Sequence, residues 1–404
     1  MSIEGALDGI KVLDMTSIVV GPSATLRLAD QGAEVIKIEP PSGDALRTLG
    51  GPSPSGKSSG KYMHFNRNKR SVCLNVKNPQ ARAALEKVLA GCDVFVSNMR
   101  PEALARLGLD AESCHAVNPT LIHCTISGFG SGGPYRGRPA YDTVVQGVSG
   151  VAGLFQRREG IPKYAPLLLC DHTVGEITAG AIAMALFKRS RDGKGSAIEI
   201  PMFETMAAFV LQEHLGPQSF SPALGAAGDA RVLDPSNLPV QTKDGWLSIS
   251  ANNDAQAAGF FRAIEKPELI EDPRFCSIAA RFKNASEWFE LRSNSLRDKP
   301  SAHWLKVLGE NDVPAMTCHT LETLPGDPHL RDVGLLSQIE HPVEGEVSAI
   351  RPTILVDGEL LPGGDPAQPL GWDTRGVLEE AGVPADEIDA LVADGGAIDG
   401  RSVG

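Results

Sequence analysis

Long apolar runs, an excess of basic residues and CxxC motifs are all missing from this chain of 404 residues. No apolar stretch reaches the roughly 18 residues that a membrane-spanning helix needs, so we expect no membrane partner. Acidic residues (50) outnumber basic ones (38), and the net charge of −12 argues against a nucleic-acid partner. The first residues lack a basic stretch followed by a long apolar one, so no signal peptide is expected. With seven cysteines, an odd number, we expect reduced thiols and a cytoplasmic protein.

The composition is that of a globular protein, with 42% hydrophobic and 22% charged residues, and the length predicts two to three domains. In the first half, short apolar runs typical of strands alternate with helical patterns. Strands are predicted at residues 10–13, 35–38, 72–76, 94–96, 121–126 and 197–200. Helices are predicted at residues 23–32, 80–90, 104–107 and 171–190, and near the end at 374–381 and 386–393. This alternation predicts parallel βαβ units and an α/β fold.

The segment 171–190 carries the clearest helical pattern. Asp171 is a candidate N-cap, and Gly193 follows the last turn. An aspartate here has two interpretations, a plain helix cap or a carboxylate nucleophile. A helix N-terminus would favour the ionised form that a nucleophile needs.

Three glycine motifs lack the structural context that their chemistry requires. Gly51–Ser58 fits the Walker A pattern, but we expect neither a strand before it nor a helix after it. Gly56–Gly60 fits GxSxG in the same polar stretch. Gly128–Gly133 fits GxGxxG after a strand, but Pro134 and Pro139 follow, so a turn-rich active-site loop is predicted. No HExxH motif or zinc-type Cys/His spacing is present, so no metal is expected.

Basic residues gather in two places. Asn66–Ser71 contains three cations, which form either a solvated turn or a phosphate clamp. Further cations stand near predicted strand ends, where ligands bind in open α/β sheets. They are Lys77, Arg100, Arg106, Arg136 and Arg138.

A series of short motifs runs through the chain in a fixed order: Gly9–Asp14, Gly21–Pro22, Leu28–Glu39, Asn66–Ser71, Asn98–Pro101, Asn118–Pro119, Ser127–Gly130, Gly133–Tyr135, Tyr141–Asp142, Asp272–Phe275, Asp312–Pro314 and Pro369–Asp373. With them the chain resembles the family III CoA-transferases (the CaiB/BaiF family), the formyl-CoA transferase and carnitine CoA-transferase type. The resemblance implies a reaction. Asp171 would attack a donor acyl-CoA, form an aspartyl anhydride and then an aspartyl-CoA thioester, and pass CoA to a small organic acid. Coenzyme A would be a substrate, with no tightly bound cofactor.

The resemblance also assigns binding residues. Val19 and Val20 would meet the pantetheine or thiol end, and Arg138 and Tyr141 would lie near the thioester. The adenine and phosphate contacts, with one further family arginine, would be Leu74, Asn75, Lys77, Asn98, Met99, Arg100 and Arg106. Val19 replaces a glutamine of the formyl-CoA transferases, and the loop at 223–228 is shorter than theirs. Both departures disfavour formate and oxalate, and leave a dicarboxylate with succinyl-CoA as candidates.

For the fold, the resemblance implies a Rossmann-like large domain formed by residues 1–215 and 331–404. A linker or active-site loop (216–237) and a smaller α+β domain (238–330) would complete the chain, in an interlocked-ring homodimer. The alternative is an isomerase like alpha-methylacyl-CoA racemase, which needs two bases. That family has a His-Asp pair where this chain has Tyr141–Asp142, and a glutamate near Asn252 or Asn253, so we favour the transferase. An ATPase or a non-catalytic CoA-binding protein is a more distant alternative.

Overall fold

The computed structural model describes residues 5–361 and 364–402, and its described residues divide into two compact units. The first contains the described residues up to Ser149, Ala165–Ala208 and those from His329 onward. The second contains Gly150–Tyr164 and Phe209–Pro328. The domain boundaries given above stay a prediction.

A seven-stranded sheet forms the centre of the first unit, in the order β14-β3-β2-β1-β4-β5-β6. All neighbouring strands are parallel except β14, which runs antiparallel to β3 at the edge. The six parallel strands have the 3-2-1-4-5-6 order of the Rossmann sheet, whose direction of progression reverses between β1 and β4. The strands are β1 (Lys11–Met15), β2 (Glu34–Glu39), β3 (Lys69–Leu74), β4 (Val94–Ser97), β5 (Ile122–Ser127), β6 (Ser196–Pro201) and β14 (Ala397–Ile398). This confirms the predicted α/β class with a parallel sheet.

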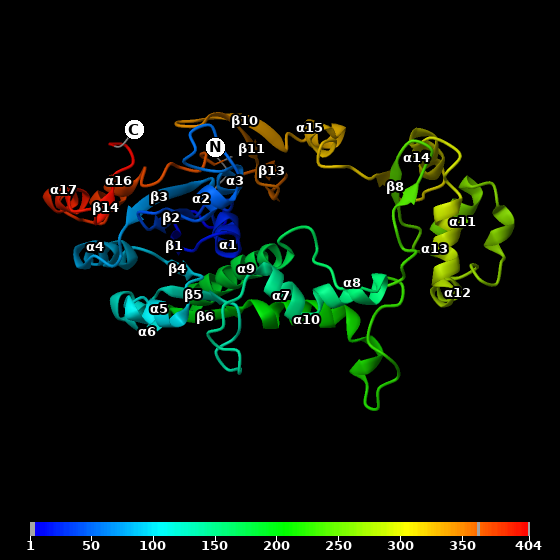
Figure 1. Ribbon diagram of the computed structural model, residues 1–404, viewed down its shortest axis with the longest axis horizontal. Coiled ribbons are helices and arrows are strands. Elements are labelled where there is room, and N and C mark those ends of the chain that lie inside the picture. Colours follow the sequence, from blue (N-terminus) through cyan, green and yellow to red (C-terminus); the bar gives the residue numbers. More distant parts are fainter. Residues whose placement is uncertain (1–4, 362–363, 403–404) are drawn as a thin grey trace. The chain divides into compact units, whose positions relative to one another are not determined.

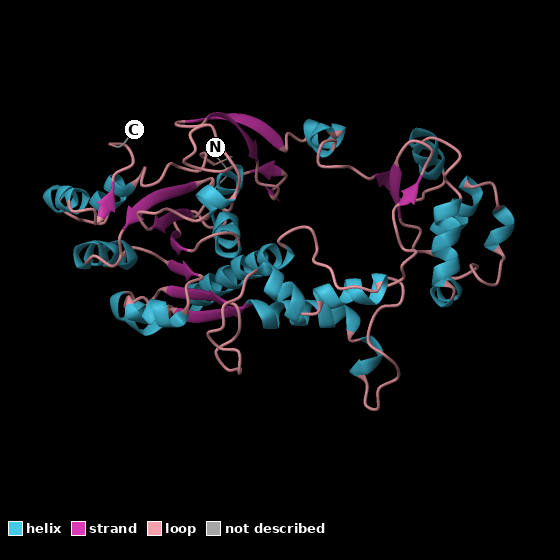
Figure 2. Ribbon diagram, viewed as in Figure 1, coloured by secondary structure: helices cyan, strands magenta, loops and turns pink. Residues whose placement is uncertain are grey.

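Helices cover both faces of this sheet (Figures 1 and 2). On one face, α1 (Val20–Ala29) packs along α9 (Leu169–Asp192), which also contacts α7 (Asp142–Val148). The other face holds the main apolar core, into which the helices on that side project leucine, valine and isoleucine side chains. These helices are α4 (Pro79–Ala90), α5 (Pro101–Arg106), α6 (Ala111–Val117), α16 (Thr374–Glu380) and α17 (Ala385–Ala393).

Local sequence explains where these elements begin and end. The Asn78 side chain caps α4, Pro79 occupies its first position, and Gly91 follows its last turn. Gly193 ends α9 in a left-handed conformation (φ 70°), which glycine adopts at low cost. The predicted strands of the large sheet and the predicted helices of this unit are all present, with shifted ends.

Two local predictions are wrong. Helix α9 begins at Leu169, after an N-cap residue, Leu168, that has no side-chain cap, so Asp171 is a first-turn residue and not the cap. A helix also follows the Walker-like glycine loop, because Ser59 caps α3 (Gly60–Asn66). No strand precedes that loop, however. The short helix α2 (Leu46–Leu49) lies there, and the P-loop geometry is absent.

The second unit combines a small antiparallel sheet with helices. Its strand order is β7-β8-β9, and its core is aromatic, with Phe260, Phe261 and Trp288 in mutual edge contacts. Its elements include α8 (Val151–Glu159), β7 (Val240–Gln241), β8 (Trp246–Ile249), α11 (Asp254–Ala263), α12 (Ile278–Lys283), α13 (Ala285–Asn294), α14 (Ser301–Glu310) and β9 (Ala315–Thr317). Helix α10 (Met202–His214) contains the border between the units at residues 208–209.

The remaining elements are short. They are α15 (Pro328–Asp332), the antiparallel pairs β10 (Leu336–His341) with β11 (Gly345–Ile350) and β12 (Leu355–Val356) with β13 (Glu359–Leu360), and three 3-10 turns at Gly216–Ser219, Pro267–Ile270 and Leu324–Gly326. Within the described ranges, no helix has the length and apolar character needed to cross a bilayer.

Candidate active site

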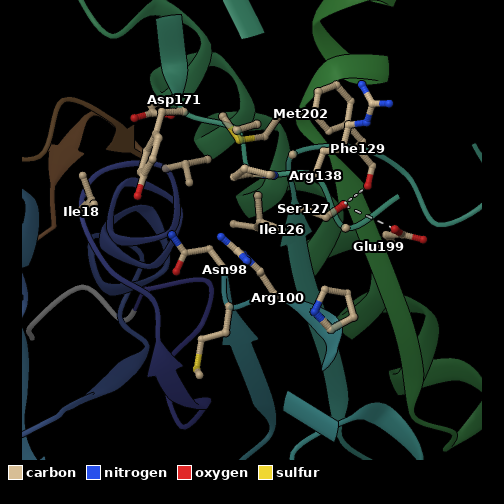
Figure 3. A pocket seen from close by; sticks show the side chains of 18 of the residues that line it. Ile18, Asn98, Arg100, Ile126, Ser127, Phe129, Arg138, Asp171, Glu199 and Met202 are labelled. Atoms are coloured by element: carbon tan, nitrogen blue, oxygen red, sulfur yellow. Dashed lines mark hydrogen bonds between the residues drawn. The ribbon is translucent and has the colours of Figure 1, made fainter. Parts of the chain in front are cut away.

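A cavity of about 250 Å³ opens in the first unit where β1, β4 and β5 end (Figure 3). The segments that follow these strands, 17–20, 98–101 and 127–141, form most of its wall. Ligands of open α/β sheets bind at the carboxyl ends of strands beside the reversal of strand order, and β1 and β4 flank that reversal here. The cavity therefore lies where the fold is expected to bind its ligand.

Asp171 lines this cavity from the first turn of α9, and the residue is 8% exposed. Its carboxylate accepts no hydrogen bond within the described part of the chain. Burial, and secondly the nearby Asp142 carboxylate, raises the pKa of Asp171 from 3.8 to about 7. The prediction that the ionised form of Asp171 is favoured is therefore wrong, because burial and the like charge of Asp142 favour the neutral form. A buried acid with a pKa near neutrality is typical of a functional site.

Eight of the twelve predicted site residues line this one cavity. They are Val19, Val20, Asn98, Met99, Arg100, Arg138, Tyr141 and Asp171. The other four lie elsewhere. Leu74 is fully buried in the main core, Asn75 and Lys77 form the turn after β3, and Arg106 is exposed at the end of α5. Their roles as CoA contacts stay a prediction.

Sequence reasoning did not assign several lining residues. The glycine-rich loop after β5 contributes Ser127, Gly128, Phe129 and Ser131, and β6 contributes Glu199. Glu199 holds this loop because its carboxylate accepts hydrogen bonds from the Ser131 amide (2.9 Å) and hydroxyl (2.6 Å). The Ser127 hydroxyl donates to it at 3.4 Å (Figure 3). The GxGxxG pattern was the available signal for the loop, whereas nothing local marked Glu199.

A strained turn forms the opposite wall. Ile18 has a φ of 69°, which is costly for a β-branched residue. Its amide donates to the Asp44 carboxylate, which is buried and paired with Lys37 at 3.0 Å. Asn98 fixes the same turn, since its side chain accepts from the Ser17 amide (3.0 Å) and donates to the Ser17 carbonyl (2.9 Å). The Asn98 amide therefore supports the cavity wall that carries Val19 and Val20.

The cations of Asn66–Ser71 form neither a solvated turn nor a phosphate clamp. Arg67 makes a two-pronged pair with Asp30, at 2.6 and 2.8 Å, and Lys69 pairs with Asp14 at 3.2 Å. Arg70 pairs with glutamates from β2 and α16. These charges are neutralised within the fold, so they are not available to an anionic ligand.

The arginines of the cavity behave differently. Arg100, Arg136 and Arg138 all line it, and none of them forms an ion pair with any described residue. Arg138 rests on the Tyr135 ring, with 4.8 Å between its guanidinium carbon and the ring centre. Three unneutralised guanidinium groups beside one cavity suit a ligand with phosphate or carboxylate groups. Among the described residues, no cluster of three or more His, Cys, Asp or Glu side chains has metal-binding geometry.

The fold and the cavity define an α/β protein in which a buried carboxylate and three arginines, none paired with a described acidic residue, line one cavity. The chain belongs to the family described as CoA-transferase family III, which matches residues 7–374. It is 31% identical over 378 residues to succinyl-CoA:glutarate CoA-transferase of Homo sapiens, covering 93% of this chain and 85% of that protein. It is also 31% identical to acetyl-CoA:oxalate CoA-transferase of Acetobacter aceti, covering 92% of this chain and 90% of that protein. The crystal structure of a CAIB/BAIF family protein from Brucella suis superposes with a TM-score of 0.79 at 28% identity, covering 94% of this chain and all of that one.

Proposed function

We propose that this family III CoA-transferase moves CoA from a donor acyl-CoA to a small carboxylic acid through covalent intermediates on Asp171. The observation that carries the proposal is the placement of one buried carboxylate in a cavity with three arginines that have no acidic partner among the described residues. A carboxylate that is desolvated and poorly stabilised is more nucleophilic than one in water.

Four balanced steps complete the exchange. An Asp171 oxygen attacks the thioester carbon, the C–S bond breaks, and an aspartyl anhydride and CoA thiolate result. The thiolate attacks the Asp171 carbonyl, which releases the donor acid and leaves an aspartyl-CoA thioester. The acceptor carboxylate attacks this thioester and forms a second anhydride with release of thiolate. The thiolate then attacks the acceptor carbonyl, which yields the new acyl-CoA and restores the Asp171 carboxylate, with no net proton transfer.

The site residues support these steps in two ways. Arg100, Arg136 and Arg138 supply charge-assisted hydrogen bonds to the anionic CoA. The N-termini of α1 and α9 both reach the cavity, at Val20 and Asp171, and their partial positive charge favours the thiolate and the oxyanions of each addition step.

For the substrates, we infer succinyl-CoA as donor and a small dicarboxylic acid as acceptor. The support is the name of the human relative, succinyl-CoA:glutarate CoA-transferase, together with the basic lining of the cavity. The proposal includes the interlocked homodimer that the family resemblance implies. It also includes the cytoplasmic location expected from the odd number of cysteines.

The test is an exchange assay read by mass spectrometry. The protein is incubated with succinyl-CoA and one isotope-labelled acid at a time, from a panel including glutarate, oxalate and formate. The expected result is a labelled acyl-CoA that forms only with intact Asp171, and most rapidly with a dicarboxylate other than oxalate. Exchange of the α-proton of a branched acyl-CoA in deuterated water, without CoA exchange, would instead support the racemase.

A further inference from the structure

Two polar side chains on α7 are among the most deeply buried of the first unit. Asp142 and Gln146 stand one helical turn apart, on the same face, and are 4% and 1% exposed. Neither residue lines the cavity, and neither is assigned a role by the reaction described above. Burial of polar groups this complete requires hydrogen-bond partners, and theirs all lie in one segment.

That segment is the stretch that leads into the nucleophile. One Asp142 oxygen accepts from the Cys170 amide (2.8 Å) and the Asp171 amide (3.1 Å), and the other accepts from the Gln146 side chain (2.6 Å). The Gln146 carbonyl accepts from the Ala165 amide at 2.8 Å, and its amino group also reaches the Leu167 carbonyl at 3.2 Å.

These contacts replace a missing helix cap. The first amides of a helix have no partner within it, and Leu168 at the N-cap position has no side chain that could accept from them. Asp142 supplies the acceptor from a different helix. The orientation of the Gln146 amide is fixed as well, because its amino group faces a carboxylate and its carbonyl faces a backbone N–H.

We propose that Asp142 and Gln146 form a positioning pair that fixes the Ala165–Asp171 segment and keeps a negative charge beside the nucleophilic carboxylate. The role of this pair in catalysis rests on the proposed function, whereas the hydrogen bonds that define the pair do not depend on it. The pair holds Asp171 through its own backbone amide, so the side chain keeps its place in the cavity while acyl groups attach and leave. The charge opposes ionisation of Asp171, which raises the basicity of the attacking oxygen.

Asp142 is the charged group that matters most for Asp171. Within α9, the neighbouring Cys170 is neutral, because burial raises the pKa of its thiol to about 12. The His172 ring packs on Phe65 of α3, at 5.4 Å between ring centres. From α1, Val20 and Ser23 pack against the backbone of α9, and the Arg27 cation of that helix pairs with Glu176 and Asp30. The cavity that Asp171 lines also holds the cations Arg100, Arg136 and Arg138, together with Tyr141 and the Glu199 carboxylate, which accepts hydrogen bonds from Ser131.

Exchanging the two side-chain types, in the double variant Asp142→Asn with Gln146→Glu, separates the effect of the hydrogen bonds from the effect of the charge beside Asp171. In Asp142→Asn alone, the new amino group would face the amino group of Gln146, and in Gln146→Glu alone two carboxylates would meet. In the double variant, the introduced amide still accepts from both α9 amides through its oxygen and donates to the introduced carboxylate, which accepts from Ala165. The bond to Leu167 is lost and a carboxylate oxygen then faces the Leu167 carbonyl, while the negative charge moves from position 142 to position 146, farther from Asp171.

The pH dependence of Asp171 protonation is measured without any CoA substrate. A carbodiimide with an amine labels protonated carboxyl groups, and peptide mass spectrometry gives the labelling rate at Asp171 from pH 5 to 9. We expect a midpoint near 7 in the wild type and one about one pH unit lower in the double variant. Both single variants should melt below the double variant. Glu346→Gln, at an exposed position of β11 that forms no ion pair with the described residues, should leave the midpoint unchanged.

The possible results of these measurements test the positioning pair and the transferase reaction separately. An unchanged midpoint in the double variant, or a double variant less stable than either single one, would overturn the positioning pair. A shifted midpoint in a protein that exchanges no CoA would keep the pair and refute the proposed transferase reaction. With an active enzyme, the pH profile of kcat/KM, which reports the free enzyme, should move with the labelling midpoint, while the KM for acyl-CoA at high pH changes less than twofold.

Discussion

Replacing Asp171 with asparagine should stabilise the protein above neutral pH, although it removes the nucleophile. In the folded state the pKa of Asp171 is raised from 3.8 to about 7, first by burial and then by Asp142. A raised pKa means that the folded state holds this proton more tightly than the unfolded chain does. The wild type therefore loses stability as the pH rises from about 4 to about 7, and no further loss follows above that. Asparagine is neutral throughout and escapes this loss.

The size of the effect follows from the shift. Three pH units at about 1.4 kcal/mol per unit give an upper limit of about 4 kcal/mol. The Asp171 carboxylate accepts no hydrogen bond from the described residues, so the substitution sacrifices no internal contact of that oxygen. We expect the free energy of unfolding of Asp171→Asn to exceed that of the wild type by about 2 to 4 kcal/mol at pH 8 and by less than about 1.5 kcal/mol at pH 5.

Urea denaturation at pH 5, 6, 7 and 8 measures this difference directly. Other titrating groups cancel, because wild type and variant share them. Glu346→Gln, at an exposed position of β11, is the matched control and should show a difference within about 0.5 kcal/mol at every pH. A difference for Asp171→Asn that does not grow with pH would refute the reasoning, as would a variant less stable than the wild type at pH 8.

Three further predictions concern activity and the buried charges. The value of kcat/KM for CoA exchange should rise with pH through about 7, since only ionised Asp171 attacks, and a profile that falls there would contradict this. Arg138→Ala should raise the KM for acyl-CoA about tenfold with a smaller change in kcat in steady-state assays, and an unchanged KM would show that this arginine does not bind CoA. Arg67→Ala should lower the free energy of unfolding by about 2 to 4 kcal/mol in urea because the buried Asp30 loses its two-pronged partner and keeps only Arg27, at 3.5 Å, whereas a loss below about 1 kcal/mol would show that Arg27 or water compensates that charge.

Much of the fold could be predicted because its signals are local. The central strands of the large sheet, such as β1 and β4, are short and buried, and helices such as α4 carry their own caps and breakers in the sequence. The error at α9 has a clear cause. Its first turn is capped from α7, about 28 residues earlier in the chain, and the local pattern, in which Asp171 is the nearest polar residue, does not contain that information.

The site was only partly predictable for the same reason. Residues that follow strand ends, such as Arg100 and Arg138, could be placed near a ligand by the rule for parallel sheets. Arg70 is neutralised in part by Glu380, which is 310 positions away in the chain. A run of cations in the sequence does not show that each one has an acidic partner. The raised pKa of Asp171 likewise arises from tertiary burial and a neighbour on another helix.

The central claim is that Asp171 itself carries the acyl group and then CoA. The most direct measurement incubates the protein with succinyl-CoA, quenches with hydroxylamine or borohydride, and maps the peptides by mass spectrometry. The account predicts a modified Asp171 in the wild type, no modification in Asp171→Ala, and loss of the signal when the acceptor acid is added before the quench. Exchange of CoA by a protein whose Asp171 stays unmodified, or modification at another carboxylate, would contradict it.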